Sequence, residues 1–124
     1  MCIRVGHTVT ITEEMVKQYA FLSGDNNPIH QDPQEAKKYH FQKPIAHGML
    51  VMGFGAEIVA ALAGRNCVIS EYELNFVNPV FVNDSVQLIA EKRENSNWVE
   101  IRGIVSGVTV VKGKAKFEIL SNSK

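Results

Sequence analysis

Residues 45–63 constrain the fold of this chain more than any other stretch. Apart from His47 and Glu57, every residue between positions 45 and 63 is apolar or glycine. Such a run predicts a helix that is buried on nearly all sides. Gly53 and Gly55 lower helix propensity, so we expect them to let strands or another helix approach the helix backbone closely.

A membrane span is the alternative interpretation of this run. A bilayer requires about 20 mostly apolar residues, whereas Glu57 and the two glycines interrupt the apolar character here. We therefore expect the helix to be buried inside a protein domain, with no membrane span.

The chain after the helix has the two-residue period of β-strands. Apolar and polar side chains alternate in residues 71–76, 86–91 and 114–119, and a further strand is expected around residues 98–105. Turn residues separate these segments. The pattern predicts an antiparallel meander with one apolar face.

The helix and the sheet are expected to pack against each other. An antiparallel sheet that is solvated on one face must cover its other face, and only the helix at residues 45–63 is long enough to do so. We therefore predict an α+β fold in which an antiparallel sheet wraps a long central helix. With 124 residues, the chain is expected to form one domain over residues 1–124.

A short amphipathic helix is predicted upstream, over residues 12–23. Met15, Tyr19 and Leu22 recur there at helical spacing and predict its apolar face. Thr12 is the expected N-cap residue. The helix is followed by residues 24–44, which are rich in Asp, Asn, Pro, Gln and His and predict an irregular segment.

Within that irregular segment we expect one helical turn, at residues 34–38. Irregular segments of this length in a small domain usually carry function or move. Residues 24–44 and the start of the apolar helix are therefore the expected location of a functional site.

Composition excludes several functional classes. Thirteen Lys plus Arg balance thirteen Asp plus Glu, which removes the electrostatic footprint of a nucleic-acid binder. Cys2 and Cys67 form neither a disulfide framework nor a Cys/His ligand cluster. Residues 1–7 lack the apolar core of a signal peptide. We therefore expect a cytoplasmic protein with no zinc site and no nucleic-acid partner.

The first candidate site lies between Ser23 and His30, where an acid, a base and two amides occur within a few positions. Pro28 keeps the segment out of a regular helix, so Asp25 and His30 can converge on one point in front of the buried helix. A carboxylate and an imidazole that share a water can hold it, accept a proton from it and return one. The alternative is that Asp25 and Asn27 only form turn hydrogen bonds and that His30 only packs.

The second candidate site is residues 44–50, at the start of the apolar helix. The N-terminus of a helix offers free N–H groups and a partial positive charge, which makes the amide of Gly48 a suitable donor to an oxygen that develops negative charge. His47 is interpreted as structural, because its ring need not reach a site that is served by the backbone. Cys67 is expected to be a small buried hydrophobe.

Other chemistries find no support in the chain. It contains no GxSxG segment and no P-loop, so covalent acyl transfer and nucleotide hydrolysis carry no positive signal.

Three segments resemble one known family. The runs FLSGDNNPIH at residues 21–30, PIAHGML at residues 44–50 and FVNPVFVND at residues 76–84 are similar to those of the MaoC-like (R)-specific enoyl-CoA hydratases and 3-hydroxyacyl-thioester dehydratases. The resemblance implies a hot-dog fold, a homodimer with the active site near the subunit interface, and an acyl-thioester substrate. It implies reversible addition of water to a trans-2-enoyl thioester, without a metal or redox cofactor.

The same resemblance implies roles for individual residues. Asp25 and His30 would be the catalytic pair, Asn27 would support the water and the loop, and Gly48 would supply the backbone oxyanion donor. Some members carry a serine at the position of Ala56, so a helix side chain that assists the site is not expected here. Acyl-chain preference stays open.

Two other functions are compatible with the same fold. A hot-dog thioesterase would need a carboxylate near the central helix, and Glu57 is the only one there. A non-catalytic acyl-thioester binding module would need neither Asp25 nor His30. The carrier is also open, since Lys37, Lys38 and Lys43 either form a basic patch for acyl-carrier protein or are simply solvated.

Overall fold

The computed structural model describes residues 2–64 and 66–120. The helices and strands in these ranges occur in the following order along the chain: β1 (Cys2–Thr10), α1 (Glu13–Ser23), the 3-10 turn η1 (Pro28–His30), α2 (Pro33–Lys38), α3 (Gly48–Ala63), β2 (Cys67–Phe76), β3 (Ser85–Arg93), β4 (Trp98–Val105) and β5 (Val108–Ile119). The predicted helical turn at residues 34–38 is confirmed as the greater part of α2.

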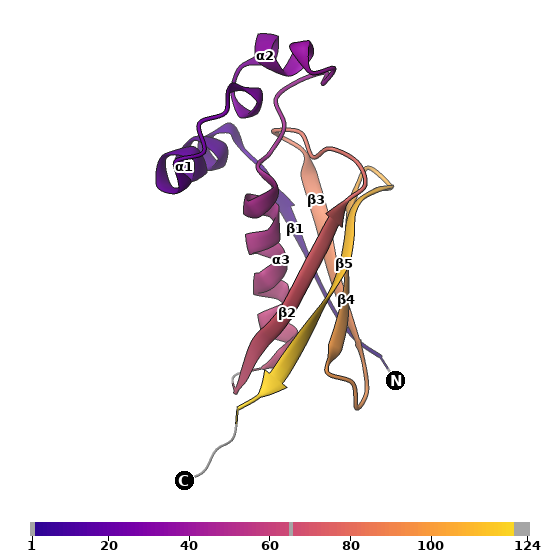
Figure 1. Ribbon diagram of the computed structural model, residues 1–124. Helices are drawn as coiled ribbons and strands as arrows, with labels where there is room; N and C mark the ends of the chain where they lie inside the picture. Colours follow the sequence, from indigo (N-terminus) through magenta and orange to yellow (C-terminus); the bar gives the residue numbers. More distant parts are fainter. Residues whose placement is uncertain (1, 65, 121–124) are drawn as a thin grey trace.

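The described strands form one five-stranded antiparallel sheet in the order β1-β3-β4-β5-β2. The sheet curves along α3, which lies against one of its faces (Figure 1). This arrangement confirms the predicted α+β fold with a sheet wrapped around a long central helix.

The meander is confirmed only for β3, β4 and β5. The strand β2 pairs with β5 rather than with its neighbour in sequence, β3. The connection at residues 77–84 is longer than a hairpin loop. It starts at β5, where Val77 N–H donates to the Val110 carbonyl at 2.8 Å, and it ends beside Ile11, whose N–H donates to the Asp84 carbonyl at 2.9 Å.

The strand β1 is not among the predicted elements. Its sequence carries a signal for a strand, since Ile3, Val5 and Val9 are β-branched and alternate with other residues. The strand pairs with β3 along its whole length, with His7 opposite Leu88.

The prediction of near-complete burial of α3 is wrong. Its inner face is buried at Val51, Ile58 and Val59, whereas Met49 and Glu57 on the opposite face are exposed. A helix that packs on a single sheet has one covered face, so the outer face stays open within one copy of the chain.

The expectation for the two helix glycines is confirmed at one position and wrong at the other. A Cβ at Gly55 would overlap with the hydroxyl of Tyr72 on β2, and this hydroxyl donates to the Met52 carbonyl at 2.6 Å. Gly53 has nothing within 4 Å of the corresponding position. Of these two glycines, only Gly55 therefore permits a close approach of β2 to α3.

The helix α1 begins as predicted, since the Thr12 hydroxyl accepts from the Met15 N–H at 3.1 Å. Its buried residues are Val16 and Ala20, and Leu22 is 81% exposed. The predicted apolar face is therefore wrong at Leu22, which lies in the last turn, where the helix leads into an exposed loop.

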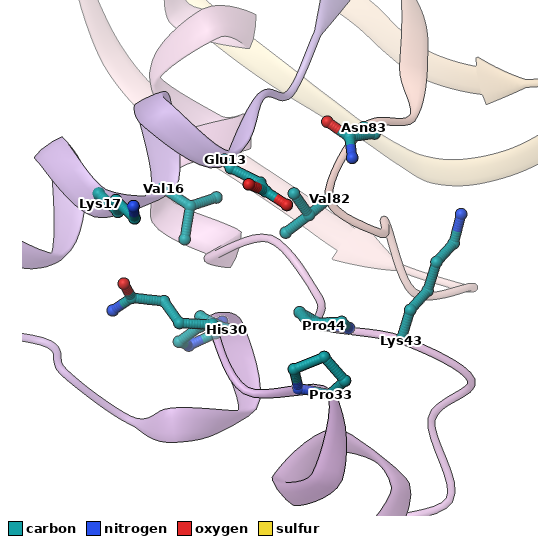
Figure 2. Close-up of a pocket in the computed structure, with 10 residues that line it drawn as sticks. Glu13, Val16, Lys17, His30, Pro33, Lys43, Pro44, Val82 and Asn83 are labelled. Carbon is teal, nitrogen blue, oxygen red and sulfur yellow. The ribbon is translucent and has the colours of Figure 1, made fainter.

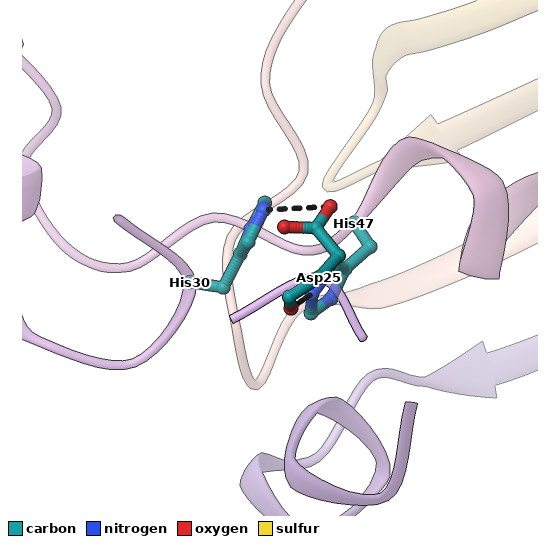
Figure 3. Close-up of side chains that lie close together, drawn as sticks. All are labelled: Asp25, His30 and His47. Carbon is teal, nitrogen blue, oxygen red and sulfur yellow. Dashed lines mark hydrogen bonds and ion pairs between the residues drawn. The ribbon is translucent and has the colours of Figure 1, made fainter. Parts of the chain in front are cut away.

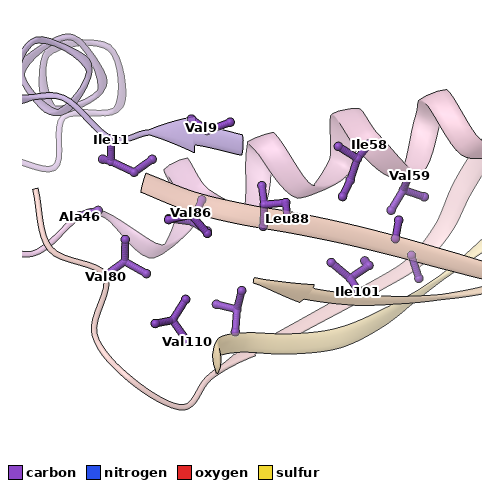
Figure 4. Packing of buried hydrophobic residues seen from close by; sticks show 14 of the residues in the cluster. Val9, Ile11, Ala46, Ile58, Val59, Val80, Val86, Leu88, Ile101 and Val110 are labelled. Carbon is purple, nitrogen blue, oxygen red and sulfur yellow. The ribbon is translucent and has the colours of Figure 1, made fainter. Parts of the chain in front are cut away.

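The hydrophobic core fills the space between α3 and the sheet (Figure 4). Its large, fully buried members come from the sheet, from α3, from α1 and from the connection between β1 and α1: Ile11, Val16, Val51, Val59, Val86, Leu88, Val99, Ile101 and Val111. Within residues 2–64 and 66–120, no helix has the length and apolar character needed to cross a bilayer.

Candidate active site

The loop after α1 is shaped by a series of local hydrogen bonds. Gly24 ends the helix in the left-handed region, with φ of 79°. The Asp25 carboxylate accepts from the Asn27 N–H at 3.3 Å, and the Asn27 side-chain oxygen accepts from the Ile29 N–H at 3.2 Å, which caps η1. The turn interactions that the sequence suggests as an alternative therefore exist, and they serve to place Asp25 beside His30.

His30 is oriented by the segment that precedes α3. Its side chain is buried, and Nδ1 lies 2.8 Å from the carbonyl oxygen of Ile45. A carbonyl can only accept, so Nδ1 carries the proton and donates. The second ring nitrogen, Nε2, therefore has a free lone pair when the ring is neutral.

The Nε2 atom of His30 faces the Asp25 carboxylate (Figure 3). The nitrogen lies 3.9 Å from Oδ2 of Asp25, and the Asp25 side chain is 51% exposed. This separation exceeds a direct hydrogen bond, whereas one water at about 2.8 Å from each atom reaches both. The pair has the geometry to hold a single water between an acid and a base.

His47 lies directly against His30. The two imidazole rings stack with centroids 3.7 Å apart and an interplanar angle of 24°, and Nε2 of His47 lies 3.1 Å from the Asp25 carbonyl oxygen. Burial lowers the pKa of His47, an effect that the bond to the Asp25 carbonyl opposes and the neighbouring His30 reinforces. The neutral ring is therefore favoured.

The N-terminus of α3 presents a free donor. His47 is the N-cap residue and makes no side-chain capping bond, while its carbonyl accepts from Leu50 and Val51. Among the described residues, the N–H of Gly48 has no hydrogen-bond acceptor. A Cβ at Gly48 would lie 3.3 Å from the Phe76 ring, so a larger residue at this position would press against that ring.

His30 lines two cavities. The first, here called the Gly48 cavity, has a volume of about 370 Å³ and includes both His30 and Gly48 in its wall. Most of its other lining residues are apolar: Phe41, Ile45, Ala46, Phe76, Val77, Pro79 and Val80. An apolar cavity with a few polar groups is typical of a small-molecule site.

The second cavity, here called the Lys43 cavity, has a volume of about 400 Å³ and lies between α1, η1 and the loop before β3 (Figure 2). Its wall includes His30, Glu13, Lys17 and Lys43. It is therefore more polar in its lining residues than the Gly48 cavity and carries charges of both signs.

The structure brings together most of the residues singled out in the sequence. Asp25 and His30 face each other, and Gly48 shares a cavity with His30. Asn27 lies in the same loop, with its oxygen engaged in the cap of η1. The sequence analysis missed Phe76 as a wall of the cavity and gave His47 no contact with His30.

The donor atoms of Asp25, His30 and His47 lie within 4.8 Å of one another, which raises the question of a metal site. The lone pairs of imidazole nitrogens lie in the ring plane, and Zn²⁺ sits about 2.0–2.1 Å from each nitrogen. Stacked rings direct their lone pairs side by side rather than toward one point. This arrangement does not fit a metal ion bound by both rings.

The fold and the site together define a class of protein, a hot-dog domain with a carboxylate and an imidazole gathered at the N-terminus of its wrapped helix. Comparison with known families agrees with this description. Residues 3–114 match the family model described as "MaoC like domain", and the chain belongs to this family.

Several curated proteins are similar to this chain in sequence. It is 33% identical over 96 residues to a mitochondrial 3-hydroxyacyl-[acyl-carrier-protein] dehydratase of Arabidopsis thaliana, a match that covers 74% of the chain and 57% of the relative. It is 40% identical over 72 residues to an (R)-specific enoyl-CoA hydratase of Aeromonas caviae, which covers 57% of the chain and 54% of the relative. The matches thus span little more than half the length of these two relatives.

A third relative is matched over more of its length. The chain is 33% identical over 116 residues to an (R)-specific enoyl-CoA hydratase of Rhodospirillum rubrum, with 86% of the chain and 78% of the relative covered.

Solved structures have the same fold. The (R)-hydratase from A. caviae involved in PHA biosynthesis superposes with a TM-score of 0.77 at 29% identity, covering 94% of both chains. The unliganded R-hydratase PhaJ1 from Pseudomonas aeruginosa superposes with a TM-score of 0.81 at 28% identity, covering 97% of this chain and 81% of that one. These similarities confirm the hot-dog fold.

Proposed function

We propose that this chain is a hydro-lyase of fatty-acid metabolism, an (R)-specific enoyl-thioester hydratase and (3R)-hydroxyacyl-thioester dehydratase. It adds water reversibly to a trans-2-enoyl thioester of CoA or of acyl-carrier protein. One observation carries the proposal: a carboxylate oxygen and an imidazole nitrogen lie 3.9 Å apart, and His30 lines one cavity together with Gly48, whose N–H has no acceptor among the described residues. The names of the relatives support the substrate class.

The proposed reaction uses the pair Asp25 and His30 to move protons. The oxygen of the shared water bonds to the β-carbon of the enoyl group, one water proton passes to the pair, and the α-carbon receives a proton. Because Nδ1 of His30 donates to Ile45, proton exchange takes place at Nε2. Acid and base are not assigned separately, because two coupled groups divide the protons between them.

Gly48 is proposed to stabilise the charge that develops on the thioester carbonyl oxygen. Its N–H is free and stands at the positive end of α3. An oxyanion donor of this kind lowers the activation barrier by about 3 kcal/mol. The apolar walls of the Gly48 cavity would receive the acyl chain.

The position of Glu57 argues against the thioesterase. Glu57 is exposed and lies nine residues after Gly48 on α3, about 13 Å along the helix axis. It is absent from the wall of the Gly48 cavity. A carboxylate at that distance does not direct a water at a carbonyl held by the Gly48 amide.

The lysines proposed for carrier recognition differ in their surroundings. Lys38 forms an ion pair with Glu35 at 2.7 Å, whereas Lys43 lines the Lys43 cavity together with His30. Lys43 therefore supports the approach of an acidic carrier to this side of the site. Lys37 is exposed and adds positive charge on α2.

The chain is proposed to act as a homodimer. The outer edge of β2 has no strand partner among the described residues, and Val68, Phe76 and Val77 are exposed on or beside it. An unpaired apolar edge favours pairing with a second copy. We further propose that residues 1–124 work as one MaoC-like hot-dog domain in the cytoplasm.

The proposal is tested with purified protein and crotonyl-CoA, by following both the loss of enoyl absorbance and the release of free thiol. Asp25→Asn and His30→Ala are expected to lower the hydration rate at least about a hundredfold, because each removes one partner of the acid–base pair. Asp25→Asn keeps an oxygen for the Asn27 N–H, which preserves the loop.

Two variants serve as matched controls. His7→Ala removes an exposed histidine of β1, and Glu57→Gln removes the carboxylate of the thioesterase alternative. Both are expected to retain wild-type hydration. Thiol release that depends on Glu57 and equals the loss of enoyl absorbance would establish the esterase instead. Equal inactivity of wild type and variants toward several chain lengths and both carriers would favour the binding module.

A further inference from the structure

His47 is the buried polar residue that the proposed reaction leaves without a role. Its side chain is 2% exposed, yet it lies at the centre of the site, between the loop of Asp25 and the ring of His30. Its Nδ1 atom is buried and has no hydrogen-bond partner among the described residues. A buried nitrogen without a partner lowers stability, so its presence beside the candidate site calls for an explanation.

The contacts of His47 fix its protonation. The Asp25 carbonyl oxygen, 3.1 Å away, only accepts, so Nε2 of His47 must carry a proton. A second proton on Nδ1 would place an unpaired donor and a positive charge in a buried position. The ring is therefore the neutral tautomer with its proton on Nε2 and a lone pair on Nδ1.

Three groups from different parts of the chain face this ring. His30 of η1 stacks on it at 3.7 Å, the ring of Tyr19 of α1 lies 4.8 Å away, and Asp25 contacts it through its backbone carbonyl. A charge on His47 would repel a proton arriving at His30 across the stacked rings. A neutral His47 leaves His30 free to take up a proton from the reacting water.

We propose that His47 is a positioning residue for the reaction, and this inference rests on the proposed function. Its Nε2–H holds the Asp25 backbone, so that the carboxylate turns toward His30, and its neutral ring holds the plane of the His30 imidazole. His47 thereby sets the 3.9 Å gap between Asp25 and His30 in which the water is held. Displacing such a pair by about 1 Å lowers the rate roughly a hundredfold.

Two variants separate the two contacts of His47. His47→Gln keeps an N–H donor near the position of Nε2 and removes the ring, whereas His47→Phe keeps a ring against His30 and removes the donor. With crotonyl-CoA, we expect His47→Phe to lower kcat about 10- to 100-fold at an unchanged KM. His47→Gln is expected to retain kcat within about threefold of wild type, because the Asp25 carbonyl stays bound.

Nitrogen-detected NMR of the histidine rings tests the protonation state without substrate. The His47→Gln spectrum identifies the His47 signals among the four histidines of the chain. We expect His47 to show a protonated Nε2 and an unprotonated Nδ1 near neutral pH. This measurement on the wild type decides the tautomer even when His47→Phe does not fold, or when crotonyl-CoA is not hydrated and the proposed function itself fails.

Three results would overturn the role of His47. The first is a doubly protonated ring, or a proton on Nδ1, near neutral pH. The second is wild-type kcat and KM in a folded His47→Phe. The third is an equal loss of kcat in His47→Gln and His47→Phe, which would remove any role for the donor.

Discussion

The contact between Gly55 and Tyr72 gives a prediction that links the packing of α3 on β2 to the candidate site. A Cβ at Gly55 would overlap with the Tyr72 hydroxyl, while the next nearest atoms, on Leu74 and on the Tyr72 ring itself, lie at an ordinary 3.6 Å. The hydroxyl is therefore the sole obstacle to alanine among the described neighbours. Gly55 lies two turns after Gly48 on the same helix.

The magnitudes follow from three effects. Overpacking lowers stability by about 1–3 kcal/mol, loss of the hydrogen bond to Met52 lowers it by about 1 kcal/mol, and alanine in a helix raises it by about 1 kcal/mol relative to glycine. Gly55→Ala is therefore expected to be about 1–3 kcal/mol less stable than wild type. Tyr72→Phe is expected to lose about 1 kcal/mol, because only the hydrogen bond disappears.

The double variant Gly55→Ala/Tyr72→Phe is expected to be nearly as stable as wild type, because the overlap is gone and the helix gain offsets the lost bond. Urea unfolding followed by far-UV circular dichroism measures all four proteins. Hydration should follow the same pattern, since pushing α3 away from β2 moves the Gly48 amide. Additive effects of the two single changes, within about 0.5 kcal/mol, would refute this account of the contact.

Three further predictions concern the loop, the first helix and the buried histidine. The pKa of His47 in the folded chain lies below its ordinary value of 6.5, so the unfolded chain binds more protons as the pH falls through that value. Wild type should therefore lose more free energy of unfolding than His47→Gln between pH 8 and pH 5, as measured by urea unfolding. Equal losses in the two proteins would contradict this. Asn27→Ala should lower both stability, by about 1 kcal/mol, and hydration, while Asn27→Ser keeps an acceptor for Ile29 and should retain most of both. Thr12→Ala should lower the free energy of unfolding by about 1 kcal/mol at unchanged KM, and a Tm equal to wild type would refute the cap.

The sequence predicts those parts of the fold that depend on local pattern. The strand β4, the central helix and the cap at Thr12 were predicted because hydrophobic period and capping chemistry are local properties. The pairing of β2 with β5 was not predicted, because it depends on the path of the connection at residues 77–84 between β2 and β3. Nothing in the alternation of a strand identifies which neighbour it will choose.

The exposure of the outer face of α3 has a similar cause. Met49 and Gly53 continue the apolar run of the helix, so the sequence offers no polar stripe that would mark a solvated side. An apolar face that stays open in one copy of the chain is typical of a surface that is covered in an assembly. The apolar pattern therefore does not distinguish the covered face of the helix from its exposed face.

For the site, the proximity of Asp25 to His30 could be predicted because both lie in one loop. The contact of His47 with His30 could not, because it joins two separate segments. Pro28 and the short spacing between Asp25 and His30 are visible in the sequence. The stacking of His47 on His30 arises because the segment before α3 passes beside η1. The sequence offers one indication of this contact: His47 directly precedes Gly48, at the start of the helix that faces the loop of His30.

Backbone hydrogen bonds between neighbouring segments fix the position of the candidate site, although part of it lies on a loop. The Ile45 N–H donates to the Ile29 carbonyl at 3.1 Å, and the Ala46 N–H donates to the Val80 carbonyl at 2.7 Å. Residues 44–46 thus lie like a short strand between the loop of His30 and the loop before β3, with Ile45 bridged to Phe81. Because the Ile45 carbonyl also fixes Nδ1 of His30, the imidazole and the Gly48 amide are positioned by one continuous stretch of backbone. Preorganisation of the proposed proton carrier, His30, and the proposed oxyanion donor, Gly48, therefore has a common origin, the chain between Pro44 and Gly48.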